Sequence, residues 1–192
     1  EDKNGYVFIL QNKIMDQVYF KKISVTATEN ILLFASAISK PINISNVAIE
    51  PEVKDLIEFL KKAGVRFKVA GRKIKVKGTS KLKGVKYRVM PDRIEAGTFA
   101  ILAATAQSDL KITQLNTGHL RNLLDKFKKM NISFEIGKDF LYIKKPNVIK
   151  PIKISTGEYP GFATDLQSPM GVLMTQAQGN SEFIENIWVH RL

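Results

Sequence analysis

Residues 46–78 read NVAIEPEVKDLIEFLKKAGVRFKVAGRKIKVKG, and residues 112–145 read ITQLNTGHLRNLLDKFKKMNISFEIGKDFLYIKK. The two stretches are copies of one pattern, offset by 67 residues at each matching apolar or turn position. The matching positions are Leu56 with Leu123, Ile57 with Leu124, Leu60 with Phe127, Gly64 with Asn131, and Phe67 with Phe134. An internal repeat of this length predicts a fold built from similar supersecondary units.

Each copy predicts one helix followed by a β-hairpin. In the first copy, apolar residues recur at the spacing i, i+3, i+4 and i+7, which indicates an amphipathic helix. Pro51 suits a first helical turn, and Gly64 and Asn131 suit a left-handed helix end. The alternating runs 66–69 and 73–76 flank Ala70-Gly71-Arg72 and predict the hairpin.

A strand, a helix and a second strand are predicted ahead of each copy. The expected elements are strands at 23–25 and 87–89, helices within 27–38 and 91–106, and strands at 42–45 and 110–113. Thr26 with Glu29, and Asp92 with Glu95, stand at capping-box spacing, which predicts the helix starts. The full unit is therefore strand, helix, strand, helix, strand, strand (βαβαββ).

The sequence begins and ends inside this repeat. Residues 5–10 and 18–21 predict two strands with no helix before them. A third unit starts at residue 152 and stops after a strand at 181–184, without its second helix and hairpin. We therefore expect a segment of a longer protein, although divergent end units capping a complete array stay the alternative.

Composition excludes several classes of protein. The chain has 192 residues, of which 44% are hydrophobic, a value typical of a globular protein rather than a disordered one. No stretch approaches the roughly 18 apolar residues of a membrane span. The first residues, EDKNGYVFIL, do not form a signal peptide. The absence of cysteine excludes disulfides and cysteine-based zinc sites within these residues, and with two histidines no metal site is expected.

The net charge of +12 invites a nucleic-acid interpretation. The excess, however, consists of 24 lysines against 6 arginines, and arginine is the residue that reads bases and clamps phosphates in bidentate geometry. The lysines occur in scattered pairs, with no run of five or six like charges. A solvated lysine surface is the favoured interpretation, and a polyanion-binding surface is the alternative.

Four segments, in this order along the chain, resemble the UDP-N-acetylglucosamine 1-carboxyvinyltransferase family of enolpyruvyl transferases. They are KISVTAT at 22–28, EPEV at 50–53, YRVMPDRIEAGT at 87–98 and YPGFATDLQ at 159–167. The resemblance covers essentially the whole chain. It implies an α/β fold, an inside-out α/β barrel with two lobes of three βαβαββ units each, present here incompletely. Residues 1–86 would end one lobe, and residues 87–192 would start the second.

The resemblance also implies a reaction. An enolpyruvyl group is transferred from phosphoenolpyruvate to the 3-hydroxyl of UDP-N-acetylglucosamine, and phosphate is released. This is the first committed step of peptidoglycan synthesis. This implies a cytoplasmic transferase of cell wall biogenesis that serves cell shape and cell division. It would need no cofactor, no metal, no membrane and no nucleic acid. The remaining half of the same enzyme would be needed to complete the substrate cleft.

Site residues follow from the same resemblance. Asp165 matches the aspartate that faces the sugar hydroxyl and acts as the base, and Arg191 matches an arginine that orients it. For a generic sequence, Thr164 or Asp165 would instead be an ordinary helix cap. Ile187 matches a position whose backbone contacts the nucleotide. A gapped alignment would place Ile187 on the arginine and match Glu185-Asn186 to the preceding Glu-Asn.

A second group of site residues lies near the start of the chain. Lys22, Ile23, Ser24 and Val25 match the segment that grips the uridine diphosphate. A helix start beside a lysine is a suitable anion site, although a plain strand-to-helix junction is commoner. Thr26 stands where the family usually has glycine, and its side chain would crowd the phosphates.

The family's proton donor, a cysteine or an aspartate, and its phosphoenolpyruvate-binding arginines fall outside this sequence. The segment alone is therefore expected to be inactive. One alternative is the shikimate-pathway enolpyruvyl transferase, which shares the repeats. The other is a lysine-rich nucleic-acid-binding module, which would need exposed aromatic rings. The repeats instead place Phe59, Phe67, Phe127 and Phe134 on core-facing positions.

Overall fold

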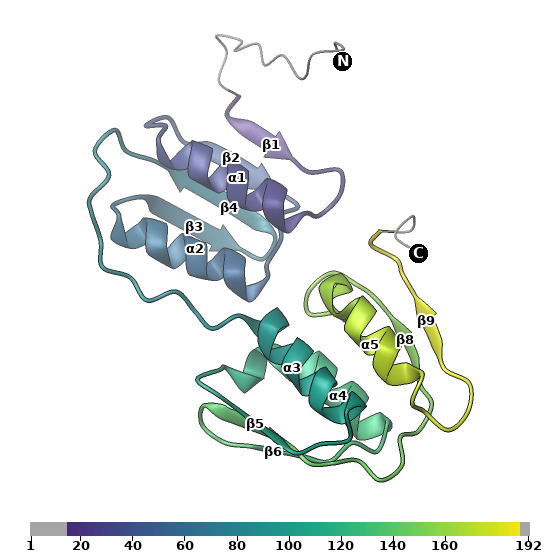
Figure 1. The fold of residues 1–192 in the computed structure, drawn as a ribbon. Helices are drawn as coiled ribbons and strands as arrows, with labels where there is room; N and C mark the ends of the chain where they lie inside the picture. Colours follow the sequence, from purple (N-terminus) through teal and green to yellow (C-terminus); the bar gives the residue numbers. More distant parts are fainter. Residues whose placement is uncertain (1–14, 189–192) are drawn as a thin grey trace, which may run out of the picture. The chain divides into compact units, whose positions relative to one another are not determined.

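The computed structural model describes residues 15–188, which divide into two compact units (Figure 1). The first unit comprises the described residues up to Ile49 together with Val53–Tyr87. The second comprises Glu50–Glu52 and the described residues from Arg88 onward. Each unit has its own hydrophobic core.

The first unit is one four-stranded sheet with two helices on one of its faces (Figure 1). Its elements are β1 (Gln17–Tyr19), α1 (Val25–Ser36), β2 (Ile42–Ser45), α2 (Pro51–Lys62), β3 (Arg66–Ala70) and β4 (Lys73–Lys77). The strand order is β1-β2-β4-β3, with β1 parallel to β2 and the other pairs antiparallel. This is the predicted βαβαββ order.

The repeat residues have the roles that their spacing predicts. Val53, Ile57 and Leu60 are buried in the core under α2. Gly64 ends this helix with φ of 107°, and Asn131 ends the equivalent helix α4 (Arg121–Lys129) with φ of 63°. In both turns the next N–H bonds back to the carbonyl five residues earlier, at 3.0 Å in the first copy and 2.9 Å in the second. The two copies therefore share the same left-handed helix end.

The second unit has two small sheets. Its elements are α3 (Arg93–Thr105), β5 (Leu110–Thr113), η1 (Thr117–Leu120), α4, β6 (Phe134–Ile136), β7 (Phe140–Ile143), β8 (Lys153–Ser155), η2 (Thr164–Leu166), α5 (Gln167–Met174) and β9 (Glu182–Ile184). One sheet is antiparallel in the order β5-β7-β6, and β8 pairs in parallel with β9. Helix α3 packs on β5, β7 and α5, so one core joins both sheets.

Within residues 15–188, two predicted strands are absent; the strand predicted at 5–10 lies outside the described residues. Residues 87–89 are irregular, because no strand among the described residues offers them a ladder of hydrogen bonds. Residues 23–25 are not a strand either, because α1 begins at Val25, and the parallel partner of β2 is β1 instead.

The two predicted helix starts differ in outcome. The capping box at Thr26 was wrong: Ser24 is the N-cap of α1, and its hydroxyl accepts the Ala27 N–H at 3.2 Å. The predicted start at Asp92 is confirmed, since its carboxylate accepts the N–H groups of Ile94 and Glu95.

The α/β fold class is confirmed, and over residues 15–188 the sheets do not close into a barrel. Within that range, no helix is both long and apolar enough to cross a bilayer. The four phenylalanines assigned to core-facing positions lie in or against the cores: Phe127 is fully buried, and Phe59, Phe67 and Phe134 pack against buried residues.

Core burial can be tested with two phenylalanines of the second unit. Phe127 is 0% exposed in its core, whereas Phe99, on α3, is 47% exposed. We expect Phe127→Ala to lower the free energy of unfolding by about 3–5 kcal/mol, because it leaves a cavity. Phe99→Ala should cost about 0.5 kcal/mol or less. Urea unfolding of the chain followed by circular dichroism measures both, and equal losses would contradict this core assignment.

Candidate functional site

Asp165 follows a tight turn in the second unit. After β8, Thr156 forms a parallel bridge with Phe162, and the Gly157 N–H donates to the Phe162 carbonyl at 3.0 Å. The peptide bond between Tyr159 and Pro160 is cis. Gly161 has no room for a side chain, since a Cβ there would lie 2.7 Å from the Glu158 carbonyl oxygen. The YPG sequence therefore builds a compact turn that leads directly into η2.

Asp165 is exposed at the centre of η2, and its two neighbours are anchored. Leu166 is buried in the core, and the Thr164 hydroxyl donates to the Glu185 carboxylate at 2.9 Å. The N-cap positions of η2 and α5 belong to Ala163 and Leu166, so the interpretation of Thr164 or Asp165 as a helix cap is wrong. A carboxylate held out from a fixed backbone is suited to act on a bound hydroxyl.

Glu185, just after β9, is the most densely hydrogen-bonded side chain of this region. It is 7% exposed. Its Oε1 accepts the Thr156 hydroxyl at 2.9 Å, the Ile187 N–H at 2.7 Å and the Trp188 N–H at 2.9 Å. Its Oε2 accepts the Thr164 hydroxyl. One carboxylate thus joins the segment after β8, the η2 turn and the segment after β9.

These donors keep Glu185 ionised. Burial raises the pKa of its carboxyl, but the hydrogen bonds from Trp188, Thr156, Ile187 and Thr164 outweigh burial and leave the pKa below its usual value. Thr156 strengthens the arrangement, because its oxygen also accepts the Asn186 N–H at 2.8 Å. An ionised carboxylate accepts hydrogen bonds only, which matches a cluster made entirely of donors.

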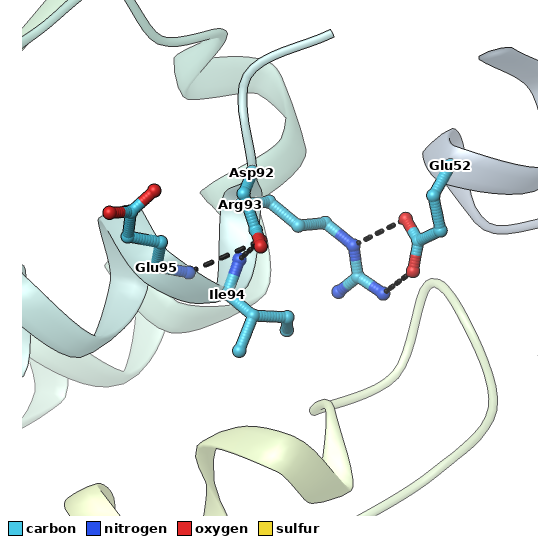
Figure 2. Close-up of polar contacts among 5 residues, drawn as sticks. All are labelled: Glu52, Asp92, Arg93, Ile94 and Glu95. Atoms are coloured by element: carbon cyan, nitrogen blue, oxygen red, sulfur yellow. Dashed lines mark hydrogen bonds and ion pairs between the residues drawn. The ribbon is translucent and has the colours of Figure 1, made fainter. Parts of the chain in front are cut away.

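The PDRIEAG segment organises the start of α3 (Figure 2). Asp92 caps the helix, and the guanidinium of Arg93 donates to both carboxylate oxygens of Glu52, at 3.0 and 2.7 Å. The Arg93 side chain is only 12% exposed, and its guanidinium lies 5.6 Å from the centre of the Tyr159 ring. A bidentate pair of this kind fixes orientation as well as charge. The contact of Arg93 with Tyr159 connects the start of α3 to the turn that precedes Asp165.

A pocket of about 180 Å³ lies beside this turn. Its lining includes Arg93, His119, Arg121, Asn122, Tyr159 and Leu166. The Asn122 amide donates to the Pro160 carbonyl at 3.1 Å, while its buried Oδ1 has no hydrogen-bond partner within residues 15–188. Asn122, on α4, therefore holds the turn at the edge of this pocket.

The segment 22–25 lies in the first unit, where it leads from β1 into α1. Lys22 is exposed, Ser24 caps the helix, and the first turn holds no acidic residue. The N–H groups of Val25 and Thr26 have no acceptor within the helix, as in any first turn. The Thr26 side chain is exposed and is not the cap. The segment can therefore offer N–H groups and a lysine to an anion.

The structure brings some of the predicted site residues together. Asp165 and Ile187 are linked through Glu185. Its carboxylate accepts the hydroxyl of Thr164, which precedes Asp165, and the backbone N–H of Ile187. Residues 22–25 lie in the other unit, and Arg191 lies outside the described residues. The role of Glu185 is not predictable from the sequence, because its partners are up to 29 residues away and follow no periodic pattern. In residues 15–188 no group of three or more acidic or histidine side chains could hold a metal ion.

Comparison with known families identifies the group to which this fold belongs. The sequence profile of EPSP synthase (3-phosphoshikimate 1-carboxyvinyltransferase) matches residues 12–191. The chain belongs to the EPSP synthase family. That profile spans both units of this EPSP synthase family chain, including the turn before Asp165 and the segment at 22–25.

Curated relatives of this EPSP synthase family chain confirm the resemblance stated from its motifs. It is 38% identical over 98% of its length to a UDP-N-acetylglucosamine 1-carboxyvinyltransferase of Acidobacterium capsulatum. It is 41% identical over 97% of its length to a protein of the same name from Pelagibacter ubique. The matches cover 44% and 46% of those two proteins, so the chain spans about half their length.

A solved structure shows the same fold. The enolpyruvyl transferase NikO from Streptomyces tendae superposes with a TM-score of 0.78 at 20% sequence identity. The match covers 88% of this chain and 41% of the NikO chain. The enolpyruvyl-transferase fold, in incomplete form, is therefore confirmed for this member of the EPSP synthase family.

Two alanine substitutions in this EPSP synthase family chain, one at Ser24 and one at Thr26, test the start of α1. We expect Ser24→Ala to lower the free energy of unfolding by about 1 kcal/mol, because the Ala27 N–H loses its acceptor. Thr26→Ala, two residues away, should change it by about 0.5 kcal/mol or less. Thermal unfolding of both variants checks the assignment, and a larger loss for Thr26→Ala would contradict it.

The pKa of Glu185 predicts a pH dependence of stability. Because the folded state lowers this pKa from 4.5, the ionised carboxylate stabilises the fold above that pH, and the stabilisation is lost as pH falls below it. Glu185→Gln should therefore lose less stability than the parent chain on acidification. Unfolding free energies measured on both sides of pH 4.5 give the comparison. Parallel pH profiles for parent and variant would rule out this linkage.

Proposed function

We propose that this chain is part of a UDP-N-acetylglucosamine 1-carboxyvinyltransferase, a cytoplasmic enzyme of peptidoglycan synthesis that serves cell shape and division. The observation that carries the proposal is the 38–41% identity to proteins of that name along nearly the whole chain. The exposed Asp165 on an anchored turn is the structural support for it. The whole enzyme would transfer enolpyruvyl from phosphoenolpyruvate to the 3-hydroxyl of the sugar.

In the proposed mechanism, Asp165 takes the proton of the sugar 3-hydroxyl as its oxygen bonds to C2 of phosphoenolpyruvate. The methylene carbon gains a proton from a donor outside this chain, which gives a tetrahedral intermediate. Loss of a proton from that carbon and of the phosphate then restores the double bond. A carboxylate that is exposed on η2 suits the first step.

The nucleotide would be held by two other segments. We assign the diphosphate to residues 22–25, where the α1 start offers N–H groups beside Lys22 without a competing acidic side chain. We assign a backbone contact with the nucleotide to Ile187, whose N–H is fixed by Glu185. Arg191 would orient Asp165 through charge-assisted hydrogen bonds.

We propose that this chain alone is inactive. We divide it, as the sequence predicted, into the end of one lobe (1–86) and the start of the next (87–192), with the rest of the enzyme needed for the cleft. Exposed apolar side chains on α1, α3 and α5 support the proposal that packing partners lie in the rest of the enzyme. They are Leu33 and Phe34 on α1, Phe99 and Leu102 on α3, and Val172 on α5. The family's proton donor and phosphoenolpyruvate-binding arginines would lie in the missing part.

A nucleic-acid-binding function has less support. Lys128 and Lys111 cover the rings of Phe134 and Phe140, at 5.9 and 4.4 Å from the ring centres. A base that stacked on either ring would compete with a lysine for one of its faces. Exposed lysines also pair with nearby acids, as Lys144 does with Glu135 at 2.6 Å. Retention on RNA or DNA at physiological salt would favour this second candidate.

The base assignment predicts a large kinetic effect. In the complete gene product that carries this chain, Asp165→Asn should lower kcat by ~10²–10⁴-fold, because the amide cannot take the hydroxyl proton. Asp125→Asn, on the exposed face of α4, is the matched control and should leave kcat unchanged. A coupled phosphate-release assay with phosphoenolpyruvate and UDP-N-acetylglucosamine measures both variants.

The same assay separates the alternatives. The 192-residue chain alone should release no phosphate, and turnover by it would contradict its proposed inactivity. UDP-N-acetylglucosamine, and not shikimate 3-phosphate, should raise the Tm of the complete gene product. Protection by shikimate 3-phosphate alone would favour the shikimate-pathway enzyme instead.

A further inference from the structure

The strongest unassigned feature of the second unit is the carboxylate of Glu185. It is buried and ionised, and it bonds to no lysine or arginine within the described residues; its partners are two hydroxyl groups and two backbone N–H groups. Without a lysine or arginine partner there, the charge of this carboxylate depends on these four donors. Its partners lie where the proposed chemistry takes place.

The four donors come from three segments that are separate in sequence. Thr156 follows β8, Thr164 belongs to η2, and Ile187 and Trp188 follow β9. Thr164 directly precedes Asp165, the proposed base. Ile187 is the proposed nucleotide contact. A single side chain therefore sets the backbone of both, with hydrogen bonds of 2.7–2.9 Å.

The two oxygens of the carboxylate divide these tasks. Oε2 accepts the Thr164 hydroxyl, next to the base. Oε1 accepts the two N–H groups beside the nucleotide contact and is also held by Thr156. Because the carboxylate is rigid and planar, a movement of one segment is transmitted to the other.

We propose that Glu185 is a positioning residue that couples the base Asp165 to the nucleotide-contact segment 187–188, so that both take their working geometry together. The proposal rests on the proposed function, because it assumes the roles given to Asp165 and Ile187. Glu185 itself need not touch either substrate.

Thr164→Val carries the test, since it keeps the β-branched shape and removes the hydroxyl that links η2 to Glu185. In the complete gene product we expect kcat to fall about tenfold, as for the loss of a hydrogen bond to a charged group. The KM for UDP-N-acetylglucosamine should change little, because the Oε1 bonds remain. Thr164→Ser, which keeps the hydroxyl, should restore kcat.

Thr105→Val is the matched control. Thr105 is also half-buried in the second unit, and its hydroxyl bonds to the Ile101 carbonyl at 2.8 Å, within α3. The control should stay folded and keep the parent kcat, because the hydroxyl that it removes does not contact Glu185. A parent-like kcat for Thr164→Val, or no recovery in a folded Thr164→Ser, would overturn the positioning role.

A second readout is independent of catalysis. Trp188 is the single tryptophan of the chain, and its backbone N–H donates to Glu185. In the 192-residue chain, Glu185→Ala should increase the quenching of tryptophan fluorescence by acrylamide, whereas Thr105→Val should not. Circular dichroism confirms that each variant is folded, and if Glu185→Ala unfolds, Glu185→Gln replaces it. Unchanged quenching in the folded Glu185 variant would overturn the link to 187–188.

The two readouts distinguish the two proposals. If the parent gene product shows no turnover with UDP-N-acetylglucosamine while Glu185→Ala increases quenching, the proposed function fails and the coupling of segments stands. If the parent turns over and Thr164→Val matches it, the positioning role fails and the proposed function stands.

Discussion

A buried carboxylate must receive hydrogen bonds, and in the second unit this requirement draws three separate segments to Glu185. The donors come from Thr156, Thr164 and the backbone after β9. Because both oxygens of the Glu185 carboxylate accept hydrogen bonds, the η2 turn and the segment after β9 are held to one another. The exposed position of Asp165, between anchored Thr164 and buried Leu166, is a consequence of this arrangement. The proposed chemistry depends on it.

The motifs that carry the family resemblance have structural roles as well as proposed chemical ones. In PDRIEAG, Asp92 caps α3, and Arg93 forms a bidentate pair with Glu52 and lies against the Tyr159 ring. In YPGFATDLQ, Gly161 makes the tight turn, and the hydroxyl of Thr164 reaches Glu185. The residues around the proposed base are therefore held by folding interactions that do not depend on a bound substrate. Such preorganisation limits the loss of freedom on binding.

The structure places much of the net charge of +12 on surface lysines. Lysines such as Lys61, Lys144 and Lys153 pair with exposed acids at the surface, where such pairs add little stability. Lys22 lies at the start of α1, where a lysine can serve a bound diphosphate. The charge is thus mainly a property of the surface, with a small part available to an anionic substrate.

The sequence by itself determined the repeat, the amphipathic helices, the hairpins and the caps at Asp92, Gly64 and Asn131, because these depend on residues close together in the chain or on a pattern that recurs along it. Tertiary structure alone decided that residues 87–89 form no strand, since a strand needs a partner to complete its hydrogen bonds. It also decided that Ser24, and not Thr26, caps α1. The role of Glu185 was decided in the same way, because its donors are brought together by packing between segments and no local spacing records their approach.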